Sequence, residues 1–293
     1  MKLEFLRKSL TLGSGFGTMS LLTLLGLLHQ ARLPAQSRAP SVGYEAASIK
    51  RSKSDDPRRH GMEFLPGGRF RLINLPLLPV LGTAYNIPWQ SIESIRLRMR
   101  GLPDWILSEP YDIEATAERA PASPGAQGKA RNERIRLMLQ SVLADRCKLK
   151  VRRDMEEMPV YSLEVEAHGP KMEKAKIAEQ DCTESAPFAP SSPSAPGCHQ
   201  FQGGAGRPGL RGLAVDMSDL ALYVSNWTDR PIVDHTGLAG LYAIQMDGWE
   251  SSNEDSSRLT LDDVLDRLGL KLVRKRAAVE TLVIEHVERP SEN

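Results

Sequence analysis

The segment Asp234-His235-Thr236-Gly237 carries the residue types that could do acid–base chemistry. Asp-Thr-Gly is the motif of aspartic protease loops, but a histidine interrupts it here, and the first half of the chain offers no second aspartate in the same setting. Those enzymes need two carboxylates that share a proton. Asp234 and His235 could instead act as a general-base pair, but neighbours in an extended segment point to opposite faces. The pattern favours a turn, with Gly237 in a conformation that other residues resist.

The cysteines suggest a second kind of chemistry. Cys182 and Cys198 flank a stretch rich in Pro, Ser and Ala that has few core-forming residues. In an oxidising compartment such a pair closes a small loop, so we predict a disulfide with Cα atoms within about 7 Å. A metal site with the adjacent His199 is the alternative, but no second His or Cys stands at ligand spacing. Cys147 follows an apolar rhythm and is predicted to be a buried, inert thiol.

Other catalytic signatures are missing from the sequence. It contains no Gly-x-Ser-x-Gly, no phosphate-binding glycine loop and no His-Glu-x-x-His. Trp89, Trp105, Trp227 and Trp249 stand near the ends of expected elements, where they are more typical of a core cap than of a binding surface. The sequence therefore predicts no catalytic residue, no metal ligand and no cofactor, and the binding residues are unknown.

The N-terminus has the pattern of an export signal. Basic residues up to Lys8 precede an apolar, Leu-rich run at 18–28 and a cleavage zone at 31–35. The run is short for a membrane span of about 20 residues, but no charge occurs between Lys8 and Arg32. Cleavage is favoured, and an uncleaved anchor stays open. We expect a periplasmic or secreted protein that meets a membrane only through this segment.

The composition is that of an ordinary globular protein. The 293 residues are 41% hydrophobic and 26% charged. A net charge of +1 gives no global field that would attract nucleic acid, so no nucleic-acid partner is expected. The basic residues Arg96, Arg98 and Arg100 alternate with apolar ones, which predicts the solvent face of a strand at 95–100.

The second half of the chain resembles a shortened copy of the first. Tyr111-Asp112-Ile113-Glu114-Ala115 precedes an amphipathic run around Leu139, and Tyr242-Ala243-Ile244-Gln245-Met246 precedes a similar run around Leu261. Each run leads into further strand-like segments. We predict an α+β fold of two related repeats, made of short helices with antiparallel strands and hairpins, the second repeat being the shorter.

Local patterns define the expected elements. Strands are predicted at 44–49, 70–72, 95–100, 111–117, 213–215, 231–233 and 242–246. Two hairpins are predicted, 148–153 with 160–166, and 270–274 with 281–287. Helices are predicted at 77–85 with Asn74 as N-cap and Pro76 in the first turn, after the caps Asn132 and Asp216, and at 261–268 after a capping box of Thr260 and Asp263.

These elements define the expected domain organisation. Its parts are a signal peptide or anchor at 1–35, a linker at 36–43, a first repeat at 44–174, a Pro/Ser/Gly-rich linker with the cysteine pair at 175–209, a second repeat at 210–289 and a tail at 290–293.

An ordered set of segments runs through nearly all of the chain beyond the leader. They are Tyr44-Glu45-Ala46-Ala47-Ser48-Ile49-Lys50, Pro66-Gly67-Gly68-Arg69-Phe70, Gly101-Leu102-Pro103-Asp104-Trp105, Tyr111-Asp112-Ile113-Glu114-Ala115, Met138-Leu139-Gln140-Ser141-Val142-Leu143-Ala144-Asp145-Arg146, Pro159-Val160-Tyr161-Ser162-Leu163, Gly169-Pro170-Lys171, Pro231-Ile232-Val233-Asp234-His235-Thr236-Gly237-Leu238 and Val283-Ile284-Glu285-His286-Val287-Glu288-Arg289-Pro290-Ser291-Glu292-Asn293. With this set the chain resembles the uncharacterised exported proteins of soil bacteria that are called the soil-associated protein family. It departs from their pattern at Cys147, where Phe is usual, and at His235, where a basic residue is usual.

The resemblance implies no catalytic residue, because that family has no established activity. Relatives of the domain occur fused to membrane-bound regulatory metallopeptidase domains, which implies a sensor or binding role by analogy. We therefore favour an exported, non-enzymatic binding or sensor module for an unknown protein, peptide or small ligand, held in a groove between the repeats or at a sheet edge. The alternatives are an exported hydrolase with an unrecognised site and a structural component of the envelope.

Overall fold

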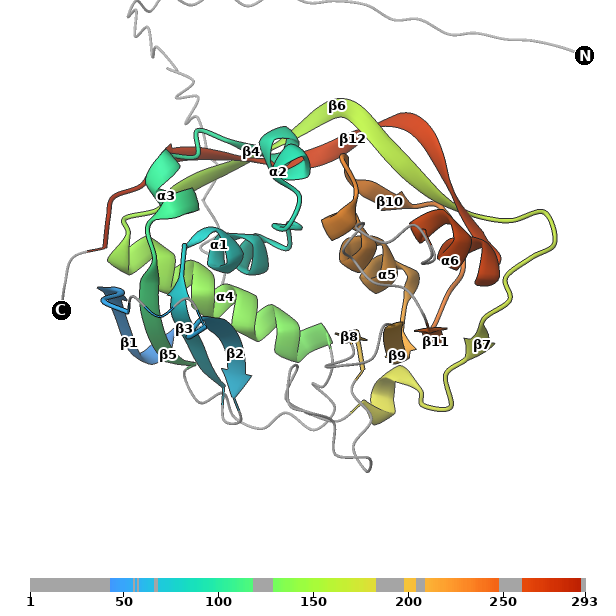
Figure 1. Ribbon diagram of the computed structural model, residues 1–293, viewed down its shortest axis with the longest axis horizontal. Coiled ribbons are helices and arrows are strands. Elements are labelled where there is room, and N and C mark those ends of the chain that lie inside the picture. Colours follow the sequence, from blue (N-terminus) through green and yellow to red (C-terminus); the bar gives the residue numbers. More distant parts are fainter. Residues whose placement is uncertain are drawn as a thin grey trace, which may run out of the picture. The chain divides into compact units, whose positions relative to one another are not determined.

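The computed structural model describes residues 43–54, 56, 58–65, 68–117, 129–182, 198–203, 209–247 and 260–290. Within these ranges the fold combines short helices with sheets in which most neighbouring strands are antiparallel, so the α+β class is confirmed (Figure 1). The predicted signal segment lies outside the described residues. No helix in the described part of the chain is long and apolar enough to cross a membrane.

The first half of the described chain forms one end sheet with helices against it. The strands lie in the order β1-β5-β3-β2, all antiparallel. Their bounds are β1 Tyr44–Arg51, β2 Gly61–Leu65, β3 Arg69–Leu75 and β5 Tyr111–Ala117. Helices α1 (Leu78–Tyr85) and α4 (Lys129–Arg146) pack on each other, and α4 contacts β1 and β5. One face of α4 is buried in this core, as the sequence predicts, through Ile135, Met138, Leu139, Val142 and Leu143.

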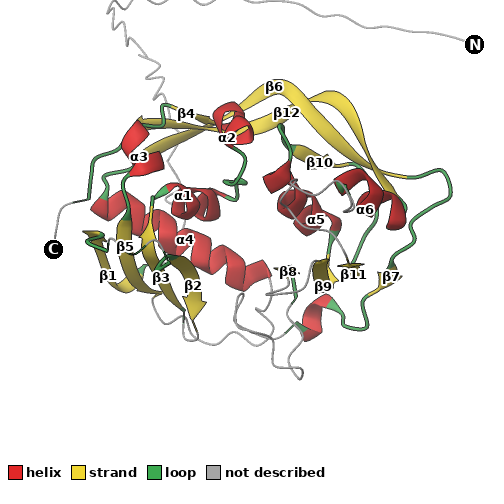
Figure 2. Cartoon of the chain, in the orientation of Figure 1, coloured by secondary structure: helices red, strands yellow, loops and turns green. Residues whose placement is uncertain are grey.

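The second half forms another end sheet with two short helices. Its strands lie in the order β7-β11-β9-β8. Their bounds are β7 Glu173–Lys174, β8 Gln202–Gly203, β9 Gly209–Val215 and β11 Tyr242–Asp247. Helices α5 (Met217–Val224) and α6 (Leu261–Arg267) begin at the predicted caps, Asp216 and Thr260, and both form capping boxes. Figure 2 shows the two sets of helices, α1 with α4 and α5 with α6, in separate halves of the described chain.

A third sheet connects the halves. The long strands β6 (Lys150–Val165) and β12 (Leu270–His286) pair antiparallel along nearly their whole length. Strand β10 (Ile232–Asp234) runs parallel to β6, and β4 (Met99–Arg100) runs parallel to β12, which gives the order β10-β6-β12-β4. Figure 1 shows β6 and β12 passing over both halves. The pair therefore fixes the two halves to each other.

Both predicted hairpins are wrong. The two arms of the first predicted hairpin are the two ends of one continuous strand, β6, and those of the second are the two ends of β12. These two strands pair with each other. The residues between the predicted arms, 154–159 and 275–280, contain neither Gly nor Asn, the residues that most readily take the positive φ of a two-residue hairpin turn. Met158, Val160 and Val279 form a small apolar cluster there, and Arg153 pairs with Glu280 at 2.7 Å.

The predicted strand at 95–100 is mostly helix. Helix α2 (Ile92–Arg98) begins after Ser91, whose side chain accepts a hydrogen bond from Ser94 N at 3.2 Å. The alternation of Ile95 and Met99 also satisfies the i, i+4 spacing of a helix, and both are buried. Arg98 does not lie on a solvent face, because its Nε donates to Glu280 O at 3.3 Å.

Two predicted helix caps are also wrong. Helix α1 begins at Leu78 after Leu77, with Pro79 rather than Pro76 in the first turn. Asn74 instead has a positive φ of 47° and donates its backbone N–H to Asp112 Oδ1 at 2.8 Å. Asn132 lies inside α4, which starts at Lys129. Three further short elements complete the described chain, α3 Asp104–Ser108, η1 Glu179–Asp181 and η2 Ser225–Trp227.

The strand orders of the two end sheets correspond. Adding six to each strand number in β1-β5-β3-β2 gives β7-β11-β9-β8. In the central sheet, exchanging β10 with β4 and β6 with β12 gives the same order read from the opposite edge. Along the chain, α4 follows β5 and leads into β6, and α6 follows β11 and leads into β12.

Candidate functional site

The segment around His199 is fixed by covalent and backbone bonds. Cys198 forms a disulfide with Cys182, and their Cα atoms are 5.6 Å apart, within the predicted distance. His199 donates its backbone N–H to Ala214 O of β9 at 2.8 Å. Its φ is +57°, which is uncommon for a residue other than glycine and costs backbone energy. Other contacts of His199 must therefore offset that cost.

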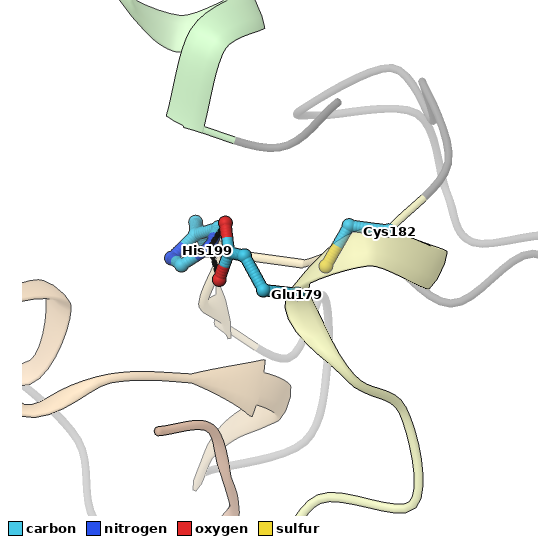
Figure 3. Close-up of side chains that lie close together, drawn as sticks. All are labelled: Glu179, Cys182 and His199. Atoms are coloured by element: carbon cyan, nitrogen blue, oxygen red, sulfur yellow. Dashed lines mark hydrogen bonds and ion pairs between the residues drawn. The ribbon is translucent and has the colours of Figure 1, made fainter. Parts of the chain in front are cut away.

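Those contacts are made by the imidazole ring. Nδ1 lies 2.6 Å from Asp219 Oδ2, and Nε2 lies 2.9 Å from both carboxylate oxygens of Glu179. Figure 3 shows the Glu179 carboxylate against the ring, and Cys182 a short way along the chain from Glu179. Burial opposes protonation of the ring, but the hydrogen bonds to the two carboxylates outweigh it and raise the pKa of His199. The geometry favours an imidazolium that donates to both acids.

The start of α5 extends this ion-pair network to the first half. Asp216 caps the helix by accepting from Asp219 N at 2.9 Å, and Asp219 Oδ2 accepts from Asp216 N at 2.9 Å. Asp216 also pairs with Lys129 of α4. Burial raises the pKa of Asp216, but the hydrogen bonds from Lys129 and from Ser218 outweigh it and bring that pKa to about 2. Lys129 and Asp216 therefore form a charged contact between the halves.

A cleft of about 490 Å³ lies beside this network. Its walls come from α1, the loop 86–90 and α4 in the first half, and from 199–201 and α5 in the second. Known ligand pockets commonly have volumes of about 300–1,000 Å³ and combine apolar walls with a few polar groups. The lining has that mixture, with Trp89, Phe201 and Tyr223 beside Asn132 and Gln200.

A second polar contact joins the two halves beside the cleft. Asn226 Oδ1 accepts from the backbone N–H groups of Trp89 at 3.2 Å and Gln90 at 3.4 Å. Asn226 Nδ2 donates to Tyr223 O at 3.0 Å. Trp89 packs directly on Gly82, where an added Cβ would lie 2.6 Å from the indole Cδ1. Trp89 thus has a fixed place in the wall of the cleft.

Phe201 and Tyr223 line the other wall of the cleft, and Trp227 contacts Tyr223 behind it. Ring centroids are 4.7 Å apart for Phe201 and Tyr223, and 4.8 Å apart for Tyr223 and Trp227. Burial raises the pKa of Tyr223 to about 12. Trp89 packs against the first core cluster, as the sequence predicts, and also lines the cleft. Trp249 lies outside the described residues.

The charged network resembles a metal site in its residue types. Two groups of side chains approach metal-binding spacing, Glu179 with Cys182 and His199, and His199 with Asp216 and Asp219. The sulfur of Cys182 is committed to the disulfide, and Asp216 and Asp219 already accept backbone, hydroxyl or ammonium protons. Such a donor set fits an ion-pair network better than a metal cage, which needs free thiolate or carboxylate ligands.

Sequence reasoning missed both carboxylate partners of His199. Glu179 and Asp219 each lie 20 residues from His199 in the chain, so no local spacing points to them. The one usable signal is the disulfide prediction, because it brings the residues around Cys182 close to the neighbour of Cys198.

A serine and a histidine also meet away from the cleft. Ser162 Oγ lies 2.8 Å from His235 Nδ1 and donates to Glu164 Oε1 at 2.8 Å. In a catalytic triad the acid hydrogen-bonds to the histidine, and the histidine then accepts the serine proton. Here the acid accepts the serine proton itself, and Ser162 is fully buried. The contact joins β6 to the end of β10, where His235 N donates to Leu163 O at 3.0 Å.

The predicted turn at Asp234 is confirmed. Asp234 Oδ1 accepts from Thr236 N at 2.9 Å and from Thr236 Oγ1 at 2.7 Å. Gly237 has a φ of +66°. The prediction for Cys147 is confirmed as well, since the thiol is free and buried, and burial raises its pKa to about 12.

Comparison with known proteins identifies a protein family. A family model described as protein of unknown function (DUF3738) matches residues 79–287, which is more than half of the chain. No curated protein and no solved structure matches the chain.

Proposed function

The chain belongs to the DUF3738 family, and we propose that it is a non-enzymatic binding or sensor module whose ligand occupies the cleft between α1, α4 and α5. The observation that carries the proposal is the origin of the lining, because both halves of the chain contribute aromatic and neutral polar side chains to one cavity of ligand size. A site built in this way can report a bound ligand as a change in how the halves contact each other.

The hydrogen bonds that polar side chains of the cleft already make within the protein favour binding over hydrolysis. Two lining hydroxyls are committed, Thr83 to Pro79 O at 2.8 Å and Ser218 to Asp216 at 2.6 Å. Hydrolysis by a side chain needs a nucleophile next to a free base. The base candidate in the lining, His199, is held between two acids with a raised pKa. An exported hydrolase and a structural envelope component are the competing outcomes of the experiment below.

Two further parts of the proposal concern origin and location. We infer that the halves are related repeats, which the matching strand orders support. We also infer export to the periplasm or beyond, which a disulfide between Cys182 and Cys198 supports, because such bonds persist in oxidising compartments. Superposition of 209–286 on 69–165 tests the repeat, and the fraction in which the processed protein is recovered from its host tests export.

A thermal-shift screen of small molecules tests the binding function. Leu222 lies in the cleft wall and is partly exposed, so Leu222→Trp fills the cavity without replacing a core residue. Leu213→Trp is the matched control, because Leu213 is 45% exposed on β9 and does not line the cleft. A ligand at one hundred times its Kd stabilises a protein by about 2.7 kcal/mol, which is roughly 5–10 °C in Tm for a chain of this size.

We expect compounds that raise Tm for the unmodified protein and for Leu213→Trp, but not for Leu222→Trp. Compounds that stabilise both variants equally would place binding elsewhere and contradict the proposal. Turnover of ester, amide or glycoside substrates that only Leu222→Trp abolishes would favour the hydrolase. A screen without any stabilising compound would favour the structural role.

A further inference from the structure

The charged side chains of the cleft are matched within the protein. Lys129 pairs with Asp216, and His199 bonds to Asp219 and Glu179. Arg136 is held by Glu133, with Nε 2.9 Å from the carboxylate. A charged ligand that leaves water for such a site finds no free counter-charge, which makes its transfer costly. The arrangement therefore selects an uncharged ligand.

Neutral hydrogen-bonding groups without a partner among the described residues lie in the same lining. Within the described part of the chain, the side-chain amides of Asn132 and Gln200 and the hydroxyl of Tyr223 make no hydrogen bond to protein. An amide offers two donors and an acceptor, and a phenol offers one donor and an acceptor. These groups match a ligand whose own groups both donate and accept, as alcohol hydroxyls do. A purely apolar ligand would leave them unpaired, at a cost for each.

The aromatic rings supply the complementary apolar contact. Tyr223 lies between Phe201 and Trp227 in tilted ring contacts, and Trp89 lies in the opposing wall. Flat aromatic faces favour ligands that present a patch of C–H bonds while their edge carries polar groups. A sugar ring has both features, because its hydroxyl groups surround an apolar face of C–H bonds.

We propose that the cleft binds a neutral saccharide of one or two sugar units, an inference that rests on the binding function proposed above. The free amides lie on α4 and on residue 200, and the phenol lies on α5, so none of the three is on a strand edge of the kind that extended peptides pair with. A peptide is therefore the less favoured ligand.

Titration calorimetry with defined probes tests this inference. The neutral probes are cellobiose, xylobiose, maltose and N,N′-diacetylchitobiose. The comparison probes are digalacturonic acid, which is anionic, the dimer of glucosamine, which is cationic, and an end-blocked trialanine. The full chain is used in every case, together with Asn132→Leu, Gln200→Leu and Tyr223→Phe. Gln245→Leu, an exposed change on β11 outside the cleft, is the control.

We expect at least one neutral disaccharide to bind, and the Asn132 and Gln200 variants to weaken its affinity about tenfold each, which corresponds to about 1.4 kcal/mol. Tyr223→Phe, which removes only a hydroxyl and preserves the ring contacts, should weaken it about fivefold. Gln245→Leu should change it less than twofold. Quenching or enhancement of tryptophan fluorescence should accompany binding, because Trp89 lines the cleft.

Other results overturn the inference and separate it from the broader proposal. If only the charged sugars or the trialanine bind, and Leu222→Trp abolishes that binding, the saccharide is wrong and the binding module stands. If a neutral disaccharide binds equally to all the cleft variants, its site is elsewhere and the inference fails. If neither these probes nor any screened compound binds, both proposals fail together.

Discussion

The two halves of the molecule share a strand order but are stabilised differently. The first has an 18-residue helix, α4, and a main core cluster with 26 buried apolar residues among those described. The second has helices of eight and seven residues, and a main cluster with 13 such residues. Small cores commonly need a covalent or polar supplement. The second half has both supplements, a disulfide and the His199 network, and both stand beside the cleft.

The comparison indicates how the site is built. The larger half supplies a wall backed by the larger core, and the smaller half supplies a wall supported by a few identifiable bonds. Loss of those bonds should therefore affect the second half and the cleft before it affects the first half.

Removal of the disulfide should have the largest effect. Replacement of Cys182 and Cys198 by Ser opens a link between residues 16 apart, and chain entropy predicts a loss of about 3 kcal/mol. Tm should fall by roughly 6–12 °C. Hydrogen exchange should accelerate in β9 and α5 more than in β5. Thiol counting on the unmodified, unreduced protein should find one free thiol, that of Cys147. A count of three would mean that the disulfide does not form, and that the second half lacks this covalent support.

Replacement of His199 should have the next largest effect. Asn tolerates a positive φ, so His199→Asn keeps the backbone and removes the ring. The variant loses hydrogen bonds between charged groups, each worth about 1.5–3 kcal/mol, and Tm should fall by about 3–10 °C at acidic pH.

The pH dependence of that effect has a definite sign. The folded pKa of His199 is raised above its ordinary value, so its stabilising contribution is complete below about pH 6.5, the unfolded pKa, and declines as the pH rises through the folded pKa. The Tm difference between the unmodified protein and His199→Asn should therefore be larger at pH 5.5 than at pH 9. A difference that grows with pH would mean that the ring is held neutral.

Gly237→Val should have a moderate effect confined to stability. The φ of +66° resists a β-branched side chain, at a cost of about 1–2 kcal/mol, although an added Cβ would meet no atom within 4 Å. Tm should fall by roughly 2–8 °C, with ligand affinity unchanged. Gly237→Asn is the control and should cost less, because Asn visits this conformation more readily.

The double change Asp234→Asn with His235→Ala should have the smallest effect. Both residues are exposed and serve a turn and a strand contact outside the cleft. Binding of any cleft ligand should stay within twofold of the unmodified protein in calorimetry. Loss of function at an unchanged Tm would show that this motif is a catalytic or binding site, and the hydrolase would then be favoured.

Local sequence patterns predicted what depends on local contacts. The caps at Asp216 and Thr260 and the turn at Gly237 follow from side chains that bond within three residues of their own position. Strands β5 and β11 follow from short alternating runs. These features needed no knowledge of the rest of the fold.

Features that depend on distant pairing were not predictable in the same way. The same alternating residues of β6 and β12 satisfy either two hairpins or one long pair, and partners as distant as Lys150 and His286 decide between them. The site also depends on distant contacts, because the disulfide and β9 position His199 beside Glu179 and Asp219, each 20 residues away in the chain. Trp89 likewise lines a cleft whose other wall, with Asn226 bonded to its backbone N–H, lies 137 residues further along the chain.

The central claim is that both halves jointly form one binding site. Hydrogen–deuterium exchange, measured with and without a compound that raises Tm, tests it most directly. We predict slower exchange in 82–90 and α4 of the first half together with 199–203 and α5 of the second, and little change in β1 or β7. Protection confined to one half, or centred on the outer strands of an end sheet, would contradict the claim.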